Sequence, residues 1–223
     1  MKVRLISSSK PSRGMYDEGL MDAQELIAFC ARVSNPANQY NMDTAEKLIR
    51  YLVKHKHWSP LEMVSACLEI ETTRDIARQI LRHRSFSFQE FSQRYADPTK
   101  DLDFVIREAR LQDTKNRQNS VLTEDRELQE RWAAMQQRVI DEVKYAYKWA
   151  IENGIAKEQA RAVLPEGNTV SRLYMNGTLR SWVHFIELRS GNGTQREHME
   201  VARECAKVIA EIFPMVTEYV QPE

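Results

Sequence analysis

The chain has 223 residues, of which 42% are hydrophobic and 29% charged, as in an ordinary soluble globular protein. Lysine plus arginine equals aspartate plus glutamate at 32 each, so no net charge attracts the whole molecule to nucleic acid or a membrane surface. No apolar run approaches the roughly 20 residues of a membrane-spanning helix, which argues against a membrane protein. We expect a single domain over residues 1–223.

The first half of the chain is predicted to contain short strands and helices. Apolar residues recur at helical spacing in some segments and alternate with polar residues in others, and this period separates helix from strand. The expected elements are a strand over residues 1–9, helices over 21–36 (capped by Asp22 with Glu25) and 43–60, a strand over 61–71, a helix over 74–84 capped by Thr72 with Asp75, and an extended segment over 85–95.

The second half is predicted to be mostly helical after a polar surface excursion over residues 98–123. The expected elements are a long helix over 124–154 capped by Thr123, a short helix over 157–165, an extended segment over 169–177, a helix over 179–190 capped by Thr178, and a last helix over 195–214 behind a capping box of Thr194 and Glu197. Strands and helices occur in runs and not as regular βαβ units, so the predicted class is α+β, a sheet packed by several helices.

An apolar stripe runs along the predicted long helix at helical spacing. We interpret it as core or as a subunit contact, and not as a cofactor site. Its members are Leu128, Trp132, Met135, Val139, Val143 and Ala146.

The three cysteines, Cys30, Cys67 and Cys205, are scattered in apolar surroundings without a C-x-x-C pair. We interpret them as reduced core residues of a cytoplasmic protein, or one in the host cytoplasm if a virus encodes it. The five histidines lack the spacing of metal ligands, so no metal is expected.

Arginines and aromatic residues alternate in the segment "RQILRHRSFSFQEFSQRYAD", residues 78–97. Guanidinium groups suit phosphate and carboxylate oxygens because they offer paired donors that always carry charge. If the helix over 74–84 extends to its predicted end, Arg78, Gln79, Arg82 and His83 share one side of it. A second basic set consists of Arg161, Arg172, Arg180, Arg189 and Arg196.

Three interpretations of these arginines remain open from the residues alone. They form a pocket for an anionic small molecule, a surface that tracks nucleic-acid phosphates while the aromatic rings stack on bases, or ordinary ion pairs of a structural helical protein. Zero net charge and the lack of a recognisable binding fold argue against nucleic acid.

The motif "RHRSFSFQEFS" strongly resembles the R-H-R-x7-S signature of flavin-dependent thymidylate synthases, with Arg82, His83, Arg84 and Ser92 at its fixed positions. Other segments are similar to blocks of that family in the same order, so the resemblance covers nearly the whole chain. These segments are "ARVS" (31–34), "HWSPLE" (57–62), "ARAVLP" (160–165), "LRSWVHFIELR" (179–189) and "GTQREH" (193–198).

The resemblance implies the family's fold and its reaction, the reductive methylation of dUMP to dTMP without a cysteine nucleophile. It further implies bound FAD as the hydride source, with NADPH and methylenetetrahydrofolate as co-substrates. The expected assembly is a homotetramer whose active sites lie between subunits, with no nucleic-acid or membrane partner.

The resemblance also implies roles for individual residues. Arg189 would be catalytic, by assisting ionisation of the uracil ring, and His57 would lie near the flavin and help place the folate. The implied dUMP-binding residues are Gln79, Arg82, Glu90, Phe91, Ser92, Gln93, Arg94, Arg161 and Arg189. The implied FAD-binding residues are Ser34, Ser59, Arg82, His83, Arg84, Glu90, Thr178, Arg180 and His184.

Overall fold

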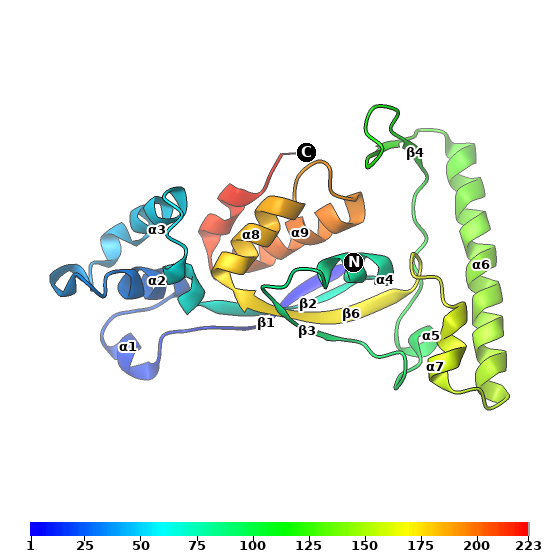
Figure 1. Ribbon diagram of the computed structural model, residues 1–223, viewed down its shortest axis with the longest axis horizontal. Helices are drawn as coiled ribbons and strands as arrows, with labels where there is room; N and C mark the ends of the chain where they lie inside the picture. Colours follow the sequence, from blue (N-terminus) through cyan, green and yellow to red (C-terminus); the bar gives the residue numbers. More distant parts are fainter. Residues whose placement is uncertain (223) are drawn as a thin grey trace.

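The computed structural model describes residues 1–222 and is built around a four-stranded antiparallel sheet (Figure 1). The order across the sheet is β1 (Lys2–Ser8), β2 (Ser65–Thr73), β6 (Val170–Thr178) and β3 (Ser87–Glu90). Each of these strands was expected as a strand or extended segment, although β2 begins four residues later than predicted, after a 3-10 turn at Ser59–Met63. The mixture of sheet and helix confirms the α+β class.

The two faces of the sheet differ in polarity, as expected when only one face is covered. Ala66, Leu68 and Ile70 of β2 are buried and point to the helical side, as their alternation predicted. Ion pairs line the opposite face, where Arg4 of β1 binds Glu69 of β2 through a contact of 2.7 Å.

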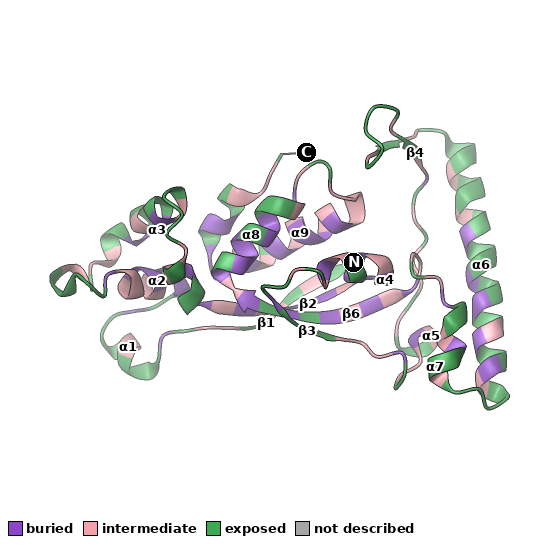
Figure 2. Ribbon diagram, in the orientation of Figure 1, coloured by how far each residue is buried: buried purple, intermediate pink, exposed green. Residues whose placement is uncertain are grey.

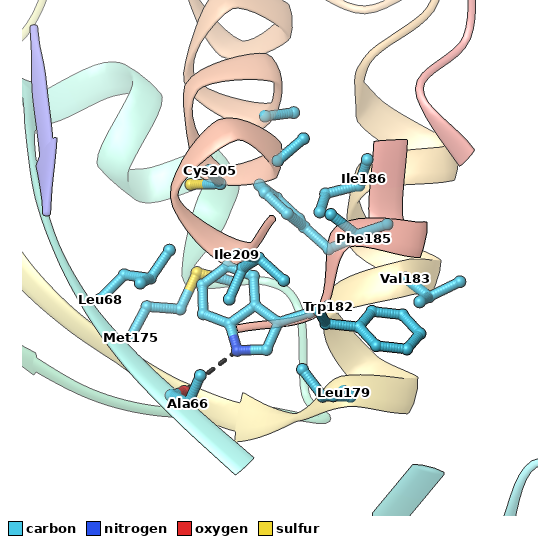
Figure 3. Packing of buried hydrophobic residues seen from close by; sticks show 14 of the residues in the cluster. Ala66, Leu68, Met175, Leu179, Trp182, Val183, Phe185, Ile186, Cys205 and Ile209 are labelled. Atoms are coloured by element: carbon cyan, nitrogen blue, oxygen red, sulfur yellow. Dashed lines mark hydrogen bonds between the residues drawn. The ribbon is translucent and has the colours of Figure 1, made fainter. Parts of the chain in front are cut away.

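Helices α8 (Leu179–Arg189) and α9 (Arg196–Ile209) lie together over the apolar face of the sheet (Figure 1). Trp182 of α8 is fully buried and donates its indole N–H to the Ala66 carbonyl oxygen at 3.0 Å, which fixes α8 to β2 (Figure 3). Phe185, Ile186 and Ile209 fill the space around the indole (Figure 3). This packing determines where each end of α8 lies, and both ends carry predicted site residues.

The remaining helices are short except for one. They are α1 (Arg13–Asp17), α2 (Ala23–Ala31), α3 (Ala45–Lys54), α4 (Arg74–Ile80), α5 (Pro98–Asp101), α6 (Arg126–Glu152) and α7 (Lys157–Ala160). Helices α2 and α3 pack on each other at one end of the molecule, and α4 packs against α9 and the sheet. No helix within residues 1–222 is long and apolar enough to cross a membrane.

Helix α6 stands apart from the central sheet, at the opposite end from α2 and α3 (Figure 1). A small separate cluster of Val143, Tyr147, Ala150, Ala160 and Leu164 attaches it to α7 and the turn that follows. Of the predicted apolar stripe, Val143 lies in this cluster and Ala146 is partly buried, but Leu128, Trp132, Met135 and Val139 are exposed on the molecular surface; much of α6 is green in Figure 2. For these residues a core role is wrong, and a subunit contact stays a prediction.

The polar excursion before α6 contains more structure than predicted. It includes α5 and a two-stranded hairpin of β4 (Arg110–Gln112) and β5 (Ser120–Leu122). Two glutamines of α6 hold its backbone: Gln129 exchanges hydrogen bonds with Ala109, at 2.7 and 2.9 Å, and Gln136 does so with Arg107, at 2.9 and 2.8 Å. These side chains replace the partners that a strand would supply to an extended segment.

Helix α4 ends at Ile80, four residues before its predicted end. After Leu81, the N–H groups of Arg82 and His83 bond i−3 carbonyls instead, with His83 N bonding the Ile80 carbonyl at 3.0 Å. The chain must leave the helix here because Phe86 turns into the core, where it lies against Trp182 with ring centroids 4.8 Å apart. Arg82, His83 and Arg84 therefore do not share a helix face with Gln79.

Helix caps were predicted with mixed success. Asp22 accepts the Glu25 N–H at 2.8 Å, and Thr178 accepts the Ser181 N–H at 3.4 Å, as predicted. The other three caps are wrong: α6 is capped by Asp125 instead of Thr123, α4 has Thr73 at its N-cap position instead of Thr72, and α9 begins after Gln195 with no side-chain cap from Thr194. The Glu197 carboxylate binds the side chains of Arg110 and Gln195, and it forms no capping box with Thr194.

The core prediction for the cysteines holds for Cys205 alone, which is fully buried. Cys30 and Cys67 are only partly buried, Cys30 near the end of α2 and Cys67 on the polar face of β2.

Candidate functional site

The segment after α4 meets the last turn of α8, and this contact joins two of the predicted site residues. Arg189 donates its Nε–H to Nε2 of His83 at 3.1 Å. Arg189 is partly buried, and no carboxylate among residues 1–222 forms an ion pair with it. Both terminal nitrogens of its guanidinium therefore remain available for an anionic or carbonyl-bearing ligand.

Two uncharged imidazoles lie beside Arg189. Burial, and next the charge of Arg189, lower the pKa of His83 to about 4 and that of His198 to about 3. The two rings lie edge to face with centroids 6.3 Å apart, and Phe185 packs against both. At neutral pH the positive charge in this part of the site is therefore that of the guanidinium.

Gln79, the last polar residue of α4, lies between two residues of the α9 start. Its Oε1 is 3.3 Å from Nδ1 of His198, and its Nε2 donates to Oε1 of Gln195 at 2.8 Å. Gln195 Nε2 in turn donates to Glu197 at 3.0 Å, and Glu197 is paired with Arg110 of β4. Both ends of the Gln79 amide are thus held by side chains from a distant part of the sequence.

A pocket of about 400 Å³ opens at the other end of α8, lined by Trp58, Glu62, Ser85, Arg180, Ser181 and His184. Thr178 Oγ1 lies 3.3 Å from the Ser181 hydroxyl, which donates to the Ser85 carbonyl at 3.2 Å, and Arg180 is paired with Glu62. A guanidinium, an imidazole and hydroxyl groups around one pocket are donors that suit the polar groups of the predicted FAD, and the Trp58 ring offers an apolar surface. Glu62 compensates the charge of Arg180, so Arg180 would act here as a hydrogen-bond donor and not as a free positive charge.

Glu90, at the end of β3, lies in a network of charges. It accepts a hydrogen bond from the Ser171 hydroxyl at 2.7 Å, and its carboxylate lies 3.7 Å from Arg74 and 4.0 Å from Arg78. Both arginines also face Glu166. Within one chain, Glu90 therefore mainly holds the side chains of Arg74 and Arg78 in place.

The segment after Glu90 carries the other predicted nucleotide residues. The Gln93 side chain is buried, and its Nε2 has no hydrogen-bond partner among residues 1–222. Arg94 lies 3.4 Å from the Glu158 carboxylate, and Arg161 donates to the carbonyl of the same residue at 3.3 Å. Arg94 and Arg161 thus meet at Glu158, although 66 positions separate them in the sequence. Phe91 and Ser92, before them, are partly buried.

The exposed arginines of the motif, Arg82 and Arg84, have no carboxylate ion-pair partner among residues 1–222. In contrast, Arg172 pairs with Glu71 and Arg196 with Glu200, so the structural ion-pair interpretation fits these two.

Ser34, His57 and Ser59 lie near the α3 end of the molecule. Ser34 lines a shallow pocket that Tyr51 also lines, and the Tyr51 ring packs edge-on against His57 with centroids 6.3 Å apart. Ser59 follows Trp58 of the α8 pocket directly. The structure therefore places these residues around the same end but does not join them through a direct contact.

The sequence analysis missed several residues that complete these groups, namely Trp58, Glu62, Arg74, Gln195 and His198. One signal was available for His198. It falls on the apolar stripe of α9, in step with Val201, Ala202 and Cys205, and a polar residue on a core-facing stripe requires a partner.

Comparison with known proteins identifies relatives over almost the whole chain. The family described as "Thymidylate synthase complementing protein" matches residues 18–215. A "Probable flavin-dependent thymidylate synthase" of Paramecium bursaria Chlorella virus 1 is 48% identical over 218 residues, covering 98% of both chains. The "Flavin-dependent thymidylate synthase" of Synechocystis is 47% identical over 216 residues, covering 97% of both.

Solved structures of the UMP/dUMP methylase PolB from Streptomyces cacaoi are also similar. The one bound with 5-Br dUMP superposes with a TM-score of 0.77 at 26% identity, covering 98% of this chain and 93% of that one. The one bound with 5-Br UMP gives 0.80 at 26% identity, with 98% and 92% covered.

Proposed function

This chain belongs to the family of flavin-dependent thymidylate synthases, and from that premise we propose that it converts dUMP to dTMP by reductive methylation. Methylenetetrahydrofolate is the proposed carbon donor and NADPH the proposed reductant. FAD, when bound, supplies the hydride.

The observation that carries this proposal furthest is the environment of Arg189. When carbon 5 of a uracil ring is prepared for attack, negative charge develops on the ring oxygens. A guanidinium that is fixed in place stabilises this charge without giving up its own proton. The contact with His83 holds Nε of Arg189, partial burial weakens competition from water, and no carboxylate within residues 1–222 neutralises the group.

The proposed dUMP site combines residues from two subunits of a homotetramer. Gln79, Arg82 and Arg189 would come from one subunit, and the segment after β3 from its neighbour. The buried Nε2 of Gln93, which has no partner in the described part of the chain, supports this arrangement, because such a group ordinarily has a hydrogen-bond partner. The contributions proposed for the neighbour are Glu90, Phe91, Ser92, Gln93, Arg94 and Arg161.

The proposed FAD site uses the α8 pocket and the exposed motif arginines. Arg180, His184 and Thr178 line or border the pocket. We assign the same role to Ser34, Ser59, Arg82, His83, Arg84 and Glu90, and we assign His57 to placing the folate.

The cysteines support a reaction without a thiol nucleophile. Burial raises the pKa of all three thiols, and Cys205 is fully buried as well. A protonated thiol is a weak nucleophile. Unpaired cysteines also support the proposal that the protein works in the cytoplasm.

Ligand binding by the purified protein tests this function against its rivals. We expect the FAD-loaded protein to bind dUMP in a calorimetric titration and to show no salt-sensitive binding of a single-stranded oligonucleotide. Oligonucleotide binding without dUMP binding would favour a nucleic-acid module. Binding of neither would favour a structural protein whose arginines serve only ion pairs.

A further inference from the structure

We infer that His198 is a positioning residue for nucleotide binding, which fixes the direction of the Gln79 side-chain amide by donating Nδ1–H to its oxygen. The inference rests on the proposed function, in which Gln79 contacts dUMP. It concerns a residue of α9 that the motif does not contain.

His198, Gln79, Gln195 and Glu197 form a series of hydrogen bonds, and the charged member, Glu197, determines which atom of each amide donates. An ionised carboxylate only accepts hydrogen bonds, so the Gln195 atom 3.0 Å from Glu197 must be the amide nitrogen. The oxygen of Gln195 then faces Gln79, and the Gln79 atom 2.8 Å from it must also be nitrogen. The oxygen of Gln79 therefore faces His198, whose Nδ1 must carry the proton.

Glu197 stays ionised around neutral pH, and this keeps the donor and acceptor of each hydrogen bond in the series fixed. Burial alone would raise the pKa of Glu197, but hydrogen bonds from its own backbone N–H and from Gln195, together with the charge of Arg110, lower it. Arg110 belongs to the β4–β5 hairpin, so the segment before α6 holds Glu197, the last residue of this hydrogen-bond series, in place.

His198 makes this donation as the neutral tautomer that carries its proton on Nδ1. With the proton on Nδ1, the lone pair lies on Nε2, which is fully buried and has no hydrogen-bond partner among residues 1–222. The groups that face the ring are Gln79 of α4, His83 of the following segment, and Phe185 and Arg189 of α8. An added proton on Nε2 would lie near the Arg189 charge without an acceptor, so the neutral Nδ1–H form is favoured.

This arrangement occupies only part of the hydrogen-bonding capacity of the Gln79 side-chain amide. One of its two amide N–H groups and one lone pair of its oxygen are occupied, so one donor and one acceptor remain. Because both ends are held, dUMP meets an amide that has already lost its rotational freedom, which strengthens binding.

Substitutions at position 198 separate positioning from packing. His198→Leu and His198→Gln remove a donor at the Nδ1 position, and each should weaken dUMP binding to the FAD-loaded protein by about fivefold to tenfold, the value of one hydrogen bond. His198→Asn places an amide N–H where Nδ1 lies and should stay within about twofold of wild type. Val201→Ala, a fully buried change on the same face of α9, is the matched packing control and should leave dUMP affinity unchanged.

Calorimetric dissociation constants at neutral pH distinguish the outcomes. Weak binding by the Leu and Gln variants with recovery by Asn supports the inference. Unchanged binding by Leu and Gln, an Asn variant as weak as Leu, or an equal loss in Val201→Ala would each overturn it while leaving the proposed function intact. If the wild-type protein itself binds no dUMP, the proposed function fails and the inference fails with it.

Discussion

Arg189 differs from the other basic residues of α8 in what surrounds it. Arg180, at the start of the helix, is paired with Glu62, whereas Arg189 contacts a neutral imidazole. A guanidinium beside a carboxylate has its charge largely compensated, and one beside a neutral imidazole does not. The same residue type is therefore suited to two roles, ligand contact at one end of the helix and stabilisation of developing charge at the other.

Arg189→Ala should lower kcat for dTMP formation by about a hundredfold to a thousandfold, since a fixed donor to developing charge is lost. The protein should still fold and retain its flavin spectrum, because the Arg189 side chain is only partly buried and, among residues 1–222, hydrogen-bonds only His83. Arg117→Ala, an exposed residue of the β4–β5 loop, is the control. Near-normal kcat in Arg189→Ala would remove Arg189 from the catalytic role.

The stability of the protein should decrease as the pH falls below about 6.5. His83 and His198 have pKa values of about 4 and about 3 when folded, against 6.5 when exposed, so the unfolded chain binds more protons in this range. For His198, which is fully buried, the slope is up to about 1.4 kcal/mol per pH unit between the two pKa values. Above about 6.5 neither histidine contributes.

Melting temperatures between pH 7.5 and 4.5 check this expectation. His198→Asn cannot take up the proton, so its melting temperature should depend less steeply on pH than that of the wild type. Parallel curves for the two proteins would show that His198 titrates normally in the folded state.

At the scale of single elements, the contact between β6 and the motif segment is the tightest in the site region. A Cβ atom on Gly177 would lie 2.4 Å from the Phe86 ring, closer than any real contact. Phe86 follows the Arg-His-Arg triplet, and its ring packs between β6 and the Trp182 indole. Glycine at this position therefore lets the motif approach the sheet.

Gly177→Ala should destabilise the protein by about 1–3 kcal/mol, the usual cost of overpacking, and should also weaken FAD binding because the motif segment shifts. Gly167→Ala is a matched control, since nothing lies within 4 Å of its added Cβ. Thermal melting and flavin titration of both variants measure the effect. Equal behaviour of the two variants would contradict the packing account.

Sequence patterns correctly predicted the helices and strands that bury one face. They failed at element ends that contacts between distant parts of the sequence determine. The alternation in β2 and the cap of α8 were readable because they depend on neighbours in the chain. The end of α4 and the start of α9 depend on Phe86, Arg110 and Gln195, whose partners lie far away in sequence. For the same reason the motif identified His83 and the block at residues 179–189 identified Arg189 as candidates, but their contact and the role of His198 depend on the fold.

At the scale of the whole molecule, α6 carries an apolar stripe that one chain leaves exposed. Trp132, Met135 and Val139 are each about half exposed. Exposed apolar patches on stable proteins ordinarily mark contact surfaces, and the proposed homotetramer offers such a contact. Among residues 1–222, Glu90 pairs with Arg74 and Arg78, Arg94 pairs with Glu158, and neither forms a hydrogen bond or ion pair with Arg189. This pattern fits active sites that are completed by a second subunit.

Subunit complementation tests this arrangement. Arg94→Ala and Arg189→Ala should each be nearly inactive. When the two variants are co-expressed, about one quarter of the sites between subunits receive both native arginines, so the hybrids should regain about one quarter of wild-type activity. Activity of the co-expressed mixture is compared with that of the two variants purified separately and mixed without exchange. Hybrids that stay inactive would place both residues in a site within one chain.

The central claim, that this protein makes dTMP with a flavin, is tested most directly by turnover of the purified wild-type protein. The complete mixture contains dUMP, methylenetetrahydrofolate, FAD and NADPH, and each component is left out in turn. Our account predicts dTMP in the complete mixture and its loss when any one of the four is missing, with FAD removed from the protein beforehand. No dTMP from a protein that binds both FAD and dUMP, or dTMP formed without a flavin, would contradict it.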